Sequence, residues 1–558
     1  MRKVDVLIEF KNEPIDFDEA SAVVASSSVR ENVADKLSES LDGVGLELAE
    51  NSAAVPLFSD PERLAGFAAT AFTEATPRRG SWVMPAKIDV AKWAACERKR
   101  SVVKVWPSSQ MSYFNERRCN CEPDGGGYPG LPPHFASGVD PQADVRRRFP
   151  GVLPHTFEDL SPEQIVVLAA QLASRYPGVL PHYPGVLPHT SESLSGSARM
   201  AGQMLGEILD LSPSGGAAID CRPFQPAVSI DVIRALLGVE RVWFDGNRGQ
   251  NIVVGILDQG INGSVYPVIG GLNDPLSPAP GSASIQSHGS MCAADVLVAA
   301  PHAKLMDYPF LGVPNSGGAL AMFQAVLTQR RANGTPHITS NSYGFTGITT
   351  DPSHEMNNIN HPIHRKVREV VLSGAPCFFS AGNCGEPCAS GRCQPSGIGS
   401  GKSIQASNAL AEVITVAAVN SRHERIGYSS QGPSHAHRQP GDSDGFEKCK
   451  PDISAYSHFF GNFGPGRPAG TSNQAFDNGT SASCPVAAGV GALLLSAFPG
   501  LTPAQLKGAL IRSATSIGQP GYDLNTGHGV INAAAAYRLI ESTDWSDFDS
   551  LIVDPPNC

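Results

Sequence analysis

The sequence reads Asp477-Asn-Gly-Thr-Ser-Ala-Ser-Cys-Pro-Val-Ala-Ala-Gly-Val-Gly-Ala-Leu-Leu-Leu-Ser496, and this stretch decides the fold. It has no charge between Asp477 and Pro499-Gly500, and a helix so small and apolar must be buried. Ser481 stands at its start, where first-turn N–H groups and the positive end of the helix dipole face whatever its hydroxyl attacks. Pro485 is expected in the first turn, where a missing N–H is tolerated. Since serine is also an ordinary N-cap, its role depends on other segments.

Two upstream segments supply an acid and a histidine in suitable places. Asn251-Ile-Val-Val-Gly-Ile-Leu-Asp258 is apolar on both faces, which is typical of a central strand in a parallel sheet. Asp258 ends this run at the edge where such sheets bind their ligands. His288 begins a further small-residue segment at Ser287-His-Gly-Ser290. Alone, the histidine would more often be structural, and the acid would equally suit a ribose or a metal ion.

Together, Asp258, His288 and Ser481 supply the three groups of nucleophilic acyl transfer. The histidine would take the proton from the serine, while the buried carboxylate would fix the imidazole tautomer and stabilise the imidazolium. The chain order Asp, His, Ser is that of subtilisin and differs from the orders of chymotrypsin and the α/β-hydrolases. The sequence therefore predicts a serine nucleophile with a histidine base.

The chain resembles the subtilisin-like serine proteases (subtilases, peptidase family S8) at three signature blocks: Asp258-Gln-Gly, His288-Gly-Ser and Gly479-Thr-Ser-Ala-Ser-Cys-Pro. A fourth block, Cys377-Phe-Phe-Ser-Ala-Gly-Asn383, resembles the family's strand that ends in Ala-Gly-Asn. The resemblance implies that Asn383 donates to the oxyanion, with the backbone N–H of Ser481 as the second donor. It covers roughly residues 225–541.

The resemblance also implies a fold and a substrate site. The expected fold is α/β, a three-layer α/β/α arrangement with a mostly parallel central sheet, preceded by a small α+β unit that resembles a pro-domain. Ser340-Asn-Ser-Tyr-Gly344 resembles the edge strand that pairs with an extended peptide substrate. The predicted substrate-binding residues are Ser342, Tyr343 and Gly344 on that strand, and Ser380, Ala381 and Gly382 along the first specificity pocket.

The sequence departs from the family pattern at two places. Gln259 stands where the family usually has Ser or Thr, which would change how the aspartate is hydrogen-bonded. After Ser481, Ala-Ser-Cys-Pro-Val replaces the more frequent Met-Ala-Ser-Pro-His, so we expect altered helix packing with the chemistry intact. The serine block also resembles that of the acid-active sedolisins, but His288 and Asn383 stand where a sedolisin has neither. A silent pseudoprotease is a further alternative, although no triad residue is missing.

Length and charge limit the other possibilities. A chain of 558 residues suggests two to four domains. A net charge of −11 argues against nucleic acid or an anionic membrane surface as the main partner. No apolar run has the length expected for a membrane span. Residues 1–10 have a strand pattern and not that of a signal peptide, so we expect a cytoplasmic protein, with secretion by another route left open.

The chain has 12 cysteines, and two groups of them are informative. Those in core-like segments are expected to behave as small hydrophobic residues: Cys292, Cys377 and Cys484. Those in one Gly- and Pro-rich loop follow Asn383 directly: Cys384, Cys388 and Cys393. In this loop a disulfide that stiffens the specificity pocket, free thiols and a metal site all remain open.

Two regions precede the predicted catalytic domain. Residues 1–110 show strand patterns at 4–10, 44–48, 54–58 and 101–106, and helix patterns at 17–41 and 60–72. By position this unit resembles an inhibitory pro-domain, and an unrelated accessory domain is the alternative. Residues 111–224 are a Pro/Gly-rich linker with short helix patterns at 161–172 and 199–211.

The linker repeats the motif Pro-Gly-Val-Leu-Pro-His, which begins at Pro150, Pro177 and Pro184. Its prolines lack the donors that a central strand or helix needs, so an extended, polyproline-like linker is expected. The repeats are either duplications in a tolerant linker or segments that occupy the cleft, bind a partner or present processing sites.

The sequence therefore predicts a serine endopeptidase that cleaves extended peptides or proteins. No cofactor is required; structural calcium is common in the family, but no metal site can be assigned from this sequence. We expect a latent precursor whose own N-terminal region is the intramolecular inhibitor, and a tail at 542–558. A dedicated maturation protease and a general degradative enzyme both fit this pattern. The alternative outside enzymes is a silent or permanently blocked binding scaffold.

Overall fold

The structure is a computed structural model. It describes residues 3–11, 27–41, 43–48, 53–58, 80–113, 219–221, 228–310, 312, 314–436, 446–463, 476–517 and 521–552. The Pro-Gly-Val-Leu-Pro-His repeats and the helices predicted at 60–72, 161–172 and 199–211 lie outside the described residues.

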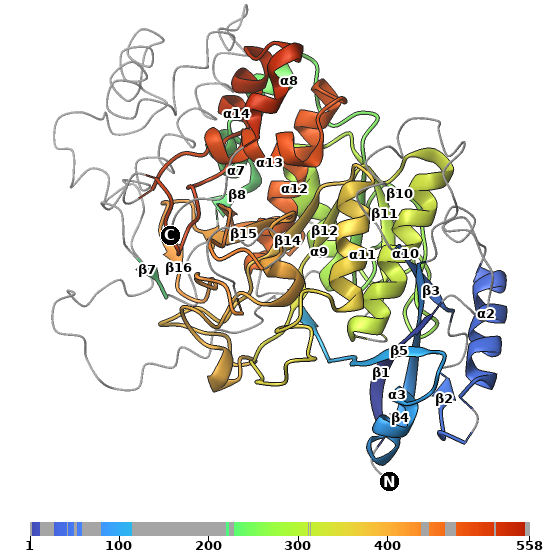
Figure 1. The fold of residues 1–558 in the computed structure, drawn as a ribbon. Coiled ribbons are helices and arrows are strands. Elements are labelled where there is room, and N and C mark those ends of the chain that lie inside the picture. Colours follow the sequence, from blue (N-terminus) through green and yellow to red (C-terminus); the bar gives the residue numbers. More distant parts are fainter. Residues whose placement is uncertain are drawn as a thin grey trace, which may run out of the picture.

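A mostly parallel sheet forms the centre of the molecule (Figure 1). Its strand order is β10-β11-β9-β12-β14-β15-β16-β7, and β17 also pairs with β15. Every pair is parallel except β15 with β16. The strands are β7 (Ile219–Asp220), β9 (Val253–Asp258), β10 (Val268–Gly271), β11 (Lys304–Pro309), β12 (Ile338–Asn341), β14 (Cys377–Ser380), β15 (Ile414–Val419), β16 (Arg425–Ile426) and β17 (Ile453–Tyr456).

Helices cover both faces of this sheet, each over its own apolar cluster. One face carries α7 (Ile230–Leu237), α8 (Val239–Phe244), α9 (His288–Ala299), α12 (Thr480–Ala497), α13 (Pro503–Arg512) and α14 (Ala533–Glu541). The other carries α10 (Ser316–Asn333) and α11 (Pro362–Leu372). This arrangement confirms the predicted three-layer α/β/α fold. Smaller elements are β8 (Val228–Ser229), β18 (Phe459–Phe460), and the 3₁₀ helices at Pro395–Gly397, Ala406–Ala409 and Trp545–Leu551.

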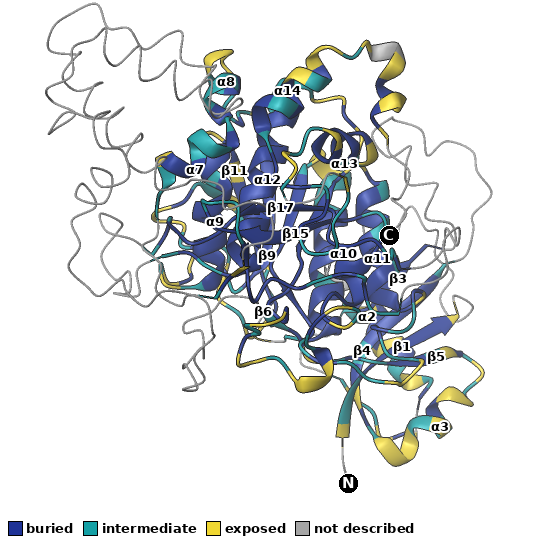
Figure 2. Cartoon of the chain, turned by 90° about the vertical axis from the view of Figure 1, so that its left-hand side faces the viewer, coloured by how far each residue is buried: buried dark blue, intermediate teal, exposed yellow. Residues whose placement is uncertain are grey.

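Helix α12 lies in the core, as its sequence predicts (Figure 2). Contrary to the expectation that no apolar run has this length, α12 is long and apolar enough to cross a bilayer, but 89% of its apolar window is buried inside the protein. A Cβ on Gly489 would lie 2.3 Å from Val296 O of α9, and one on Gly491 would lie 2.9 Å from the Phe378 ring. These two glycines therefore let α12 pack closely against α9 and the sheet.

Pro485 does not lie where the sequence predicts. The helix begins at Thr480, so the proline is in the second turn and not the first. It cannot donate the helical hydrogen bond to Ser481 O, four residues earlier. The Ser342 hydroxyl and the Cys292 thiol donate to that carbonyl instead, at 3.2 and 3.6 Å. The side chains of Ser342, directly after β12, and of Cys292 in α9 thus replace the missing N–H.

The N-terminal residues form a separate antiparallel sheet in the order β2-β4-β1-β5, with β3 also paired to β4. The strands are β1 (Lys3–Lys11), β2 (Glu47–Leu48), β3 (Val55–Leu57), β4 (Ser81–Asp89) and β5 (Val102–Pro107). Helices are α2 (Ser27–Glu39), the 3₁₀ helix Val90–Lys92 and α3 (Trp93–Glu97). The strands predicted at 4–10 and 101–106 are confirmed, whereas β4 was not predicted.

Both faces of this small sheet are covered. On β1, Val6, Ile8 and Phe10 pack in the unit's own core with α2, while Leu7 joins the apolar cluster under α10 and α11. The N-terminal unit therefore packs directly against these two helices (Figure 1). At the opposite end of the linker, β7 is already part of the central sheet, so this sheet begins before the domain boundary predicted at residue 225.

Candidate active site

Asp258 and His288 meet at the carboxyl end of the central sheet. Asp258 ends β9, and His288 is the first residue of α9, which is capped by the Ser287 hydroxyl. The ring atom His288 Nδ1 lies 2.7 and 2.8 Å from the two carboxylate oxygens of Asp258. Because an ionised carboxylate only accepts, Nδ1 carries the proton, and the lone pair of the neutral ring is on Nε2. This is the tautomer that a general base needs.

Gln259, the unusual neighbour of the aspartate, has a defined role here. Its backbone N–H donates to Asp258 Oδ1 at 2.7 Å, and its side-chain carbonyl accepts from the backbone N–H of His288 at 3.1 Å. The residue therefore orients both the carboxylate and the start of the histidine helix. The Gln259 side chain bonds His288 and not the carboxylate, so the predicted change in the hydrogen bonding of Asp258 stays a prediction.

Ser481 is the second residue of α12 and is fully buried. Its hydroxyl donates to Ser342 O at 3.3 Å, and the Ser342 hydroxyl donates back to Ser481 O at 3.2 Å. The Cys292 thiol lies 3.7 Å from Asp258 Oδ2, 3.8 Å from His288 Nδ1 and 3.6 Å from Ser481 O. Through Ser342 and Cys292, the structure brings the predicted nucleophile, base and acid into one cluster.

Cys292 itself is a neutral thiol in this cluster. Burial raises its pKa well above the ordinary value, and the nearby Asp258 carboxylate raises it further. A thiol held in this form is a weak donor and a poor nucleophile. It therefore fills the space between the three polar residues and does not compete with Ser481.

The amide of Asn383 is held in one orientation by Thr480. Its Oδ1 accepts from the Thr480 backbone N–H at 3.0 Å and from the Thr480 hydroxyl at 2.9 Å. The hydroxyl Oγ1 in turn accepts from Gly382 N at 3.1 Å. Since Oδ1 faces Thr480, the Nδ2 end of the amide points the other way. Asn383 and the residue next to Ser481 are therefore one connected unit.

The predicted substrate strand is already paired with another strand of the chain. Residues Tyr343–Gly344 form β13, which pairs antiparallel with β6 (Ser112–Tyr113). Met111, just before β6, is buried in a small apolar pocket with Tyr343, Phe345 and Ile363. Its backbone N–H also donates to Pro314 O at 2.7 Å. The segment after the N-terminal unit thus occupies the edge expected to bind a peptide.

Ser380, Ala381 and Gly382 lie at the end of β14, next to the same strand. Asn408 joins the two predicted walls of the substrate site, because its Nδ2 donates to Tyr343 O at 3.0 Å and to Ser380 O at 2.8 Å. The loop after Asn383 is crossed by two disulfides, Cys384–Cys393 and Cys221–Cys388. Of the three alternatives for this loop, the structure therefore has the disulfide, while Cys292, Cys377 and Cys484 are free and buried.

Among the described residues, one group has ligand atoms close enough together to hold a metal ion: Asp258, His288 and Cys292. Their nitrogen and sulfur atoms do not suit calcium, which prefers an all-oxygen shell of six to eight ligands. No calcium site is therefore assigned.

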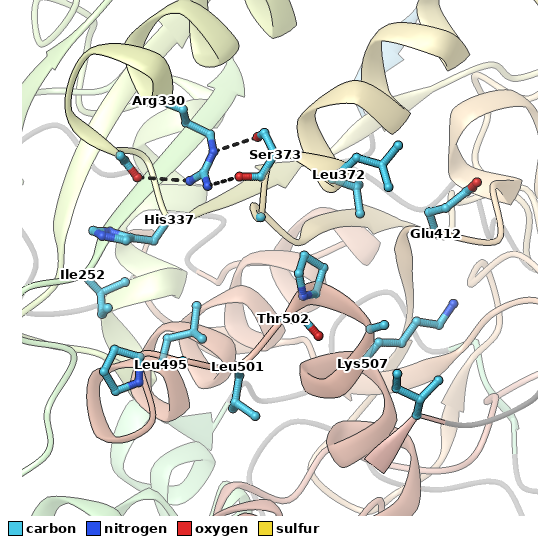
Figure 3. Close-up of a pocket in the computed structure, with 18 of the residues that line it drawn as sticks. Ile252, Arg330, His337, Leu372, Ser373, Glu412, Leu495, Leu501, Thr502 and Lys507 are labelled. Atoms are coloured by element: carbon cyan, nitrogen blue, oxygen red, sulfur yellow. Dashed lines mark hydrogen bonds between the residues drawn. The ribbon is translucent and has the colours of Figure 1, made fainter. Parts of the chain in front are cut away.

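Figure 3 shows a cavity in another part of the structure. It has a volume of about 1060 Å³ and lies at the amino ends of β9 and β12, where Ile252 and His337 line it. Its charged groups are bonded to the protein: Arg330 donates to Ser373 Oγ at 2.8 Å and to Ser373 O at 2.6 Å. Because none of the predicted site residues lines this cavity, it is not part of the candidate active site.

Sequence reasoning missed Thr480, Asn408 and Cys292 as partners of the site. Thr480 stands in the motif Gly479-Thr-Ser-Ala-Ser-Cys-Pro, so its position next to Ser481 could have indicated a role in the site. Asn408 has no such signal, since it bonds residues 28 and 65 positions away.

Comparison with known proteins identifies the family of this chain. The family model described as "Subtilase family" matches residues 249–529. Subtilisin DY from Bacillus licheniformis is 27% identical over 311 residues, which is 54% of this chain and 96% of that protein. Subtilisin E from Bacillus subtilis is 28% identical over 303 residues, 52% of this chain and 67% of that protein. Among solved structures, MycP1 from Mycobacterium smegmatis has 19% identity and a TM-score of 0.41, covering 58% of this chain and 88% of that one. The chain therefore belongs to the subtilase family, whose members are serine endopeptidases that need no cofactor for catalysis.

Proposed function

We propose that this chain is a latent serine endopeptidase in which Asp258, His288 and Ser481 are the catalytic triad. The Ser481 hydroxyl attacks the scissile carbonyl while His288 Nε2 takes its proton, and Asp258 stabilises the imidazolium through Nδ1–H. His288 then gives the proton to the leaving amine. A water molecule, activated by the same histidine, releases the acyl group. The hydrogen-bonded Asp258–His288 pair beside Ser481 supports these roles.

Asn383 and the backbone N–H of Ser481 stabilise the oxyanion in this proposal. Donors fixed before the reaction stabilise the developing charge without a reorganisation cost. Thr480 fixes the Asn383 amide through two hydrogen bonds, at 3.0 and 2.9 Å, which supports such a role.

The N-terminal unit is the inhibitor. The single observation that carries this step is the antiparallel pairing of Ser112–Tyr113 with Tyr343–Gly344. In an antiparallel pair, the chain that passes from Ser112 to Tyr113 runs toward Ser342, whose carbonyl lies 3.3 Å from Ser481 Oγ. A substrate that adds a strand to this edge would meet the same backbone groups. Access to Ser481 therefore requires that β6 leave the strand.

Intact mass of the wild type beside Ser481→Ala tests the proposal. The wild type is expected to lose an N-terminal piece that ends shortly after Tyr113, and the variant is expected to stay full length. Cleavage of both proteins at the same bond would mean that another protease does the cutting. If both stay intact, a serine-directed fluorophosphonate decides between a latent enzyme and a blocked scaffold. Labelling of the wild type alone, after removal of residues 1–113 by a protease site inserted there, supports the enzyme.

The cellular location and the biological role stay predictions. The cytoplasmic expectation rests on the first ten residues, while the two disulfides at the active-site loop are typical of an oxidising compartment. Fractionation of the producing cell would decide between these locations. A dedicated maturation role would appear as cleavage of one protein in the cell's proteome, and a degradative role as cleavage of many.

A further inference from the structure

The turn that presents Ser481 has a backbone conformation that needs support. Gly479, two residues before the serine, has φ 81° and ψ 168°. This region is open almost only to glycine and persists where the surroundings hold it. Gly479 is the N-cap residue of α12, and as a glycine it has no side chain that could cap the helix. The position of Ser481 therefore depends on what binds the two peptide groups of Gly479.

Two side chains bind these groups from outside the helix. The Ser457 hydroxyl donates to Gly479 O at 2.9 Å. The phenol oxygen of Tyr428 accepts from Gly479 N at 2.7 Å. Tyr428 follows β16 and is buried. The orientation of the Gly479 amide is therefore set by a tyrosine from a distant part of the chain.

Tyr428 is itself fixed by His458. The phenol oxygen lies 2.8 Å from His458 Nε2. The contact holds whichever group donates, because the phenol oxygen can accept two hydrogen bonds and Nε2 of a neutral imidazole can either donate or accept. His458 also donates its backbone N–H to Asp477 O at 3.0 Å. Both ends of the turn, Asp477 and Gly479, are thus held by this tyrosine–histidine pair.

We propose that Tyr428, oriented by His458, is a positioning residue for the nucleophile. It fixes the Gly479 amide, and Gly479 is followed by Thr480, which holds Asn383, and by Ser481. One hydrogen-bonded pair therefore sets the relative position of the attacking oxygen and the oxyanion donor. The inference rests on the proposed endopeptidase function, because it concerns the same serine.

The test compares Tyr428→Phe with a matched control, Tyr456→Phe. Both tyrosines are buried, and both hydroxyls bond a histidine Nε2 at 2.8 Å, His458 for Tyr428 and His423 for Tyr456. Loss of the Tyr428 hydroxyl leaves Gly479 N–H buried without its acceptor and frees the turn. We expect kcat on a peptide substrate to fall about tenfold or more, with KM within about twofold, because small displacements of reacting groups mainly cost turnover. Tyr456→Phe should keep the wild-type kcat.

A second readout does not need turnover. Hydrogen exchange of backbone amides should become faster in residues 477–482 of Tyr428→Phe and stay unchanged there in Tyr456→Phe. Unchanged kcat, a rise in KM alone, or unchanged exchange in this segment would each overturn the positioning role. If the wild type neither hydrolyses peptides nor reacts with a fluorophosphonate, the proposed function fails. The exchange comparison still decides in that case whether Tyr428 holds the turn.

Discussion

Asp307 is a buried carboxyl group that the proposed chemistry does not use. It lies on β11, and its Oδ2 accepts from the backbone N–H groups of Ile261 and Gly281, both at 2.9 Å. Burial raises its pKa from 3.8 to about 7, against the lowering effect of these two hydrogen bonds, and the charge of Asp258 adds to the rise. The residue therefore ties the segment after Asp258 to the sheet and is partly protonated at neutral pH.

This shift predicts a specific pH dependence of stability. Between pH 3.8 and about pH 7 the folded protein keeps the Asp307 proton that the unfolded chain has released, so its stability falls as the pH rises. Asp307→Asn cannot ionise, and its oxygen can still accept from Ile261 and Gly281. The free energy of unfolding of the variant minus that of the wild type should be larger at pH 8 than at pH 5, by on the order of 2 kcal/mol. Urea unfolding of both proteins at pH 5 and pH 8 measures this difference. The same difference at the two pH values would contradict the prediction.

The candidate site residues could be named from the sequence because they stand in contiguous motifs. Asp258, His288, Asn383 and Ser481 each stand in a short block, and their local neighbours restrict what they can do. Tyr428 was not predictable, because its partner Gly479 is 51 residues away and nothing around the tyrosine indicates a hydrogen bond to it. Contacts that only the tertiary fold creates leave no local pattern in one sequence.

At the scale of elements, the loop after Asn383 depends on its covalent links. The Cys384–Cys393 bridge, with a sequence separation of 9, begins directly after Asn383, the proposed oxyanion donor. The variant Cys384→Ser/Cys393→Ser should lower the free energy of unfolding by about 2 kcal/mol, since short cross-linked loops restrict the unfolded chain. It should also raise KM, because the residues predicted to line the specificity pocket, Ser380 to Gly382, directly precede this loop. Thermal unfolding and peptide hydrolysis check both effects. The same double change at the buried free thiols Cys96 and Cys377 is the control and should leave KM unchanged.

Strand β4 shows why some elements escaped prediction. Pro85 stands in its middle, and proline argues against a central strand because it cannot donate to a ladder. In the structure, β3 pairs with residues 81–83 of β4 and β2 pairs with residues 86–87 on the same side. Pro85 falls in the gap between these two short partners, while β1 pairs along the other side. The proline is tolerated there because two partners share one edge, an arrangement that the local sequence does not reveal.

At the scale of the whole molecule, the N-terminal unit is held by an apolar surface with polar contacts at its edges. Glu9 accepts from Ser81, from Trp106 and from Arg365 of α11, the last at 2.6 Å. Burial raises the pKa of Glu9, but Arg365 and the hydrogen bonds outweigh it and keep the pKa below its ordinary value. Separating the two parts would break the ion pair between Glu9 and Arg365, so this pair adds a charged contact to the apolar surface.

His361 gives this docking a dependence on pH. Its Nε2–H donates to Pro107 O of the N-terminal unit at 2.9 Å, and its Nδ1 accepts from Ile363 N at 3.4 Å. In the neutral ring one nitrogen donates a hydrogen bond and the other accepts one, so the ring cannot take up a further proton without losing one of these hydrogen bonds. Burial lowers its pKa, although Glu355 and Glu9 act in the opposite direction; His354 and the cation of Arg365 also face this region.

We expect release of the N-terminal unit to accelerate as the pH falls below about 6.5, the ordinary pKa of histidine. The released enzyme can bind a proton on His361 that the docked form excludes, so acid weakens docking by up to about tenfold per pH unit. The rate at which hydrolysis appears after a pH jump of the self-cleaved protein measures this. His361→Gln keeps a donor for Pro107 O and should remove the pH dependence. His364→Gln is the matched control, because His364 bonds only Glu355 O and Ser407 Oγ of the catalytic part, at 2.6 and 3.0 Å. Equal pH slopes for His361→Gln and the wild type would show that another group controls release.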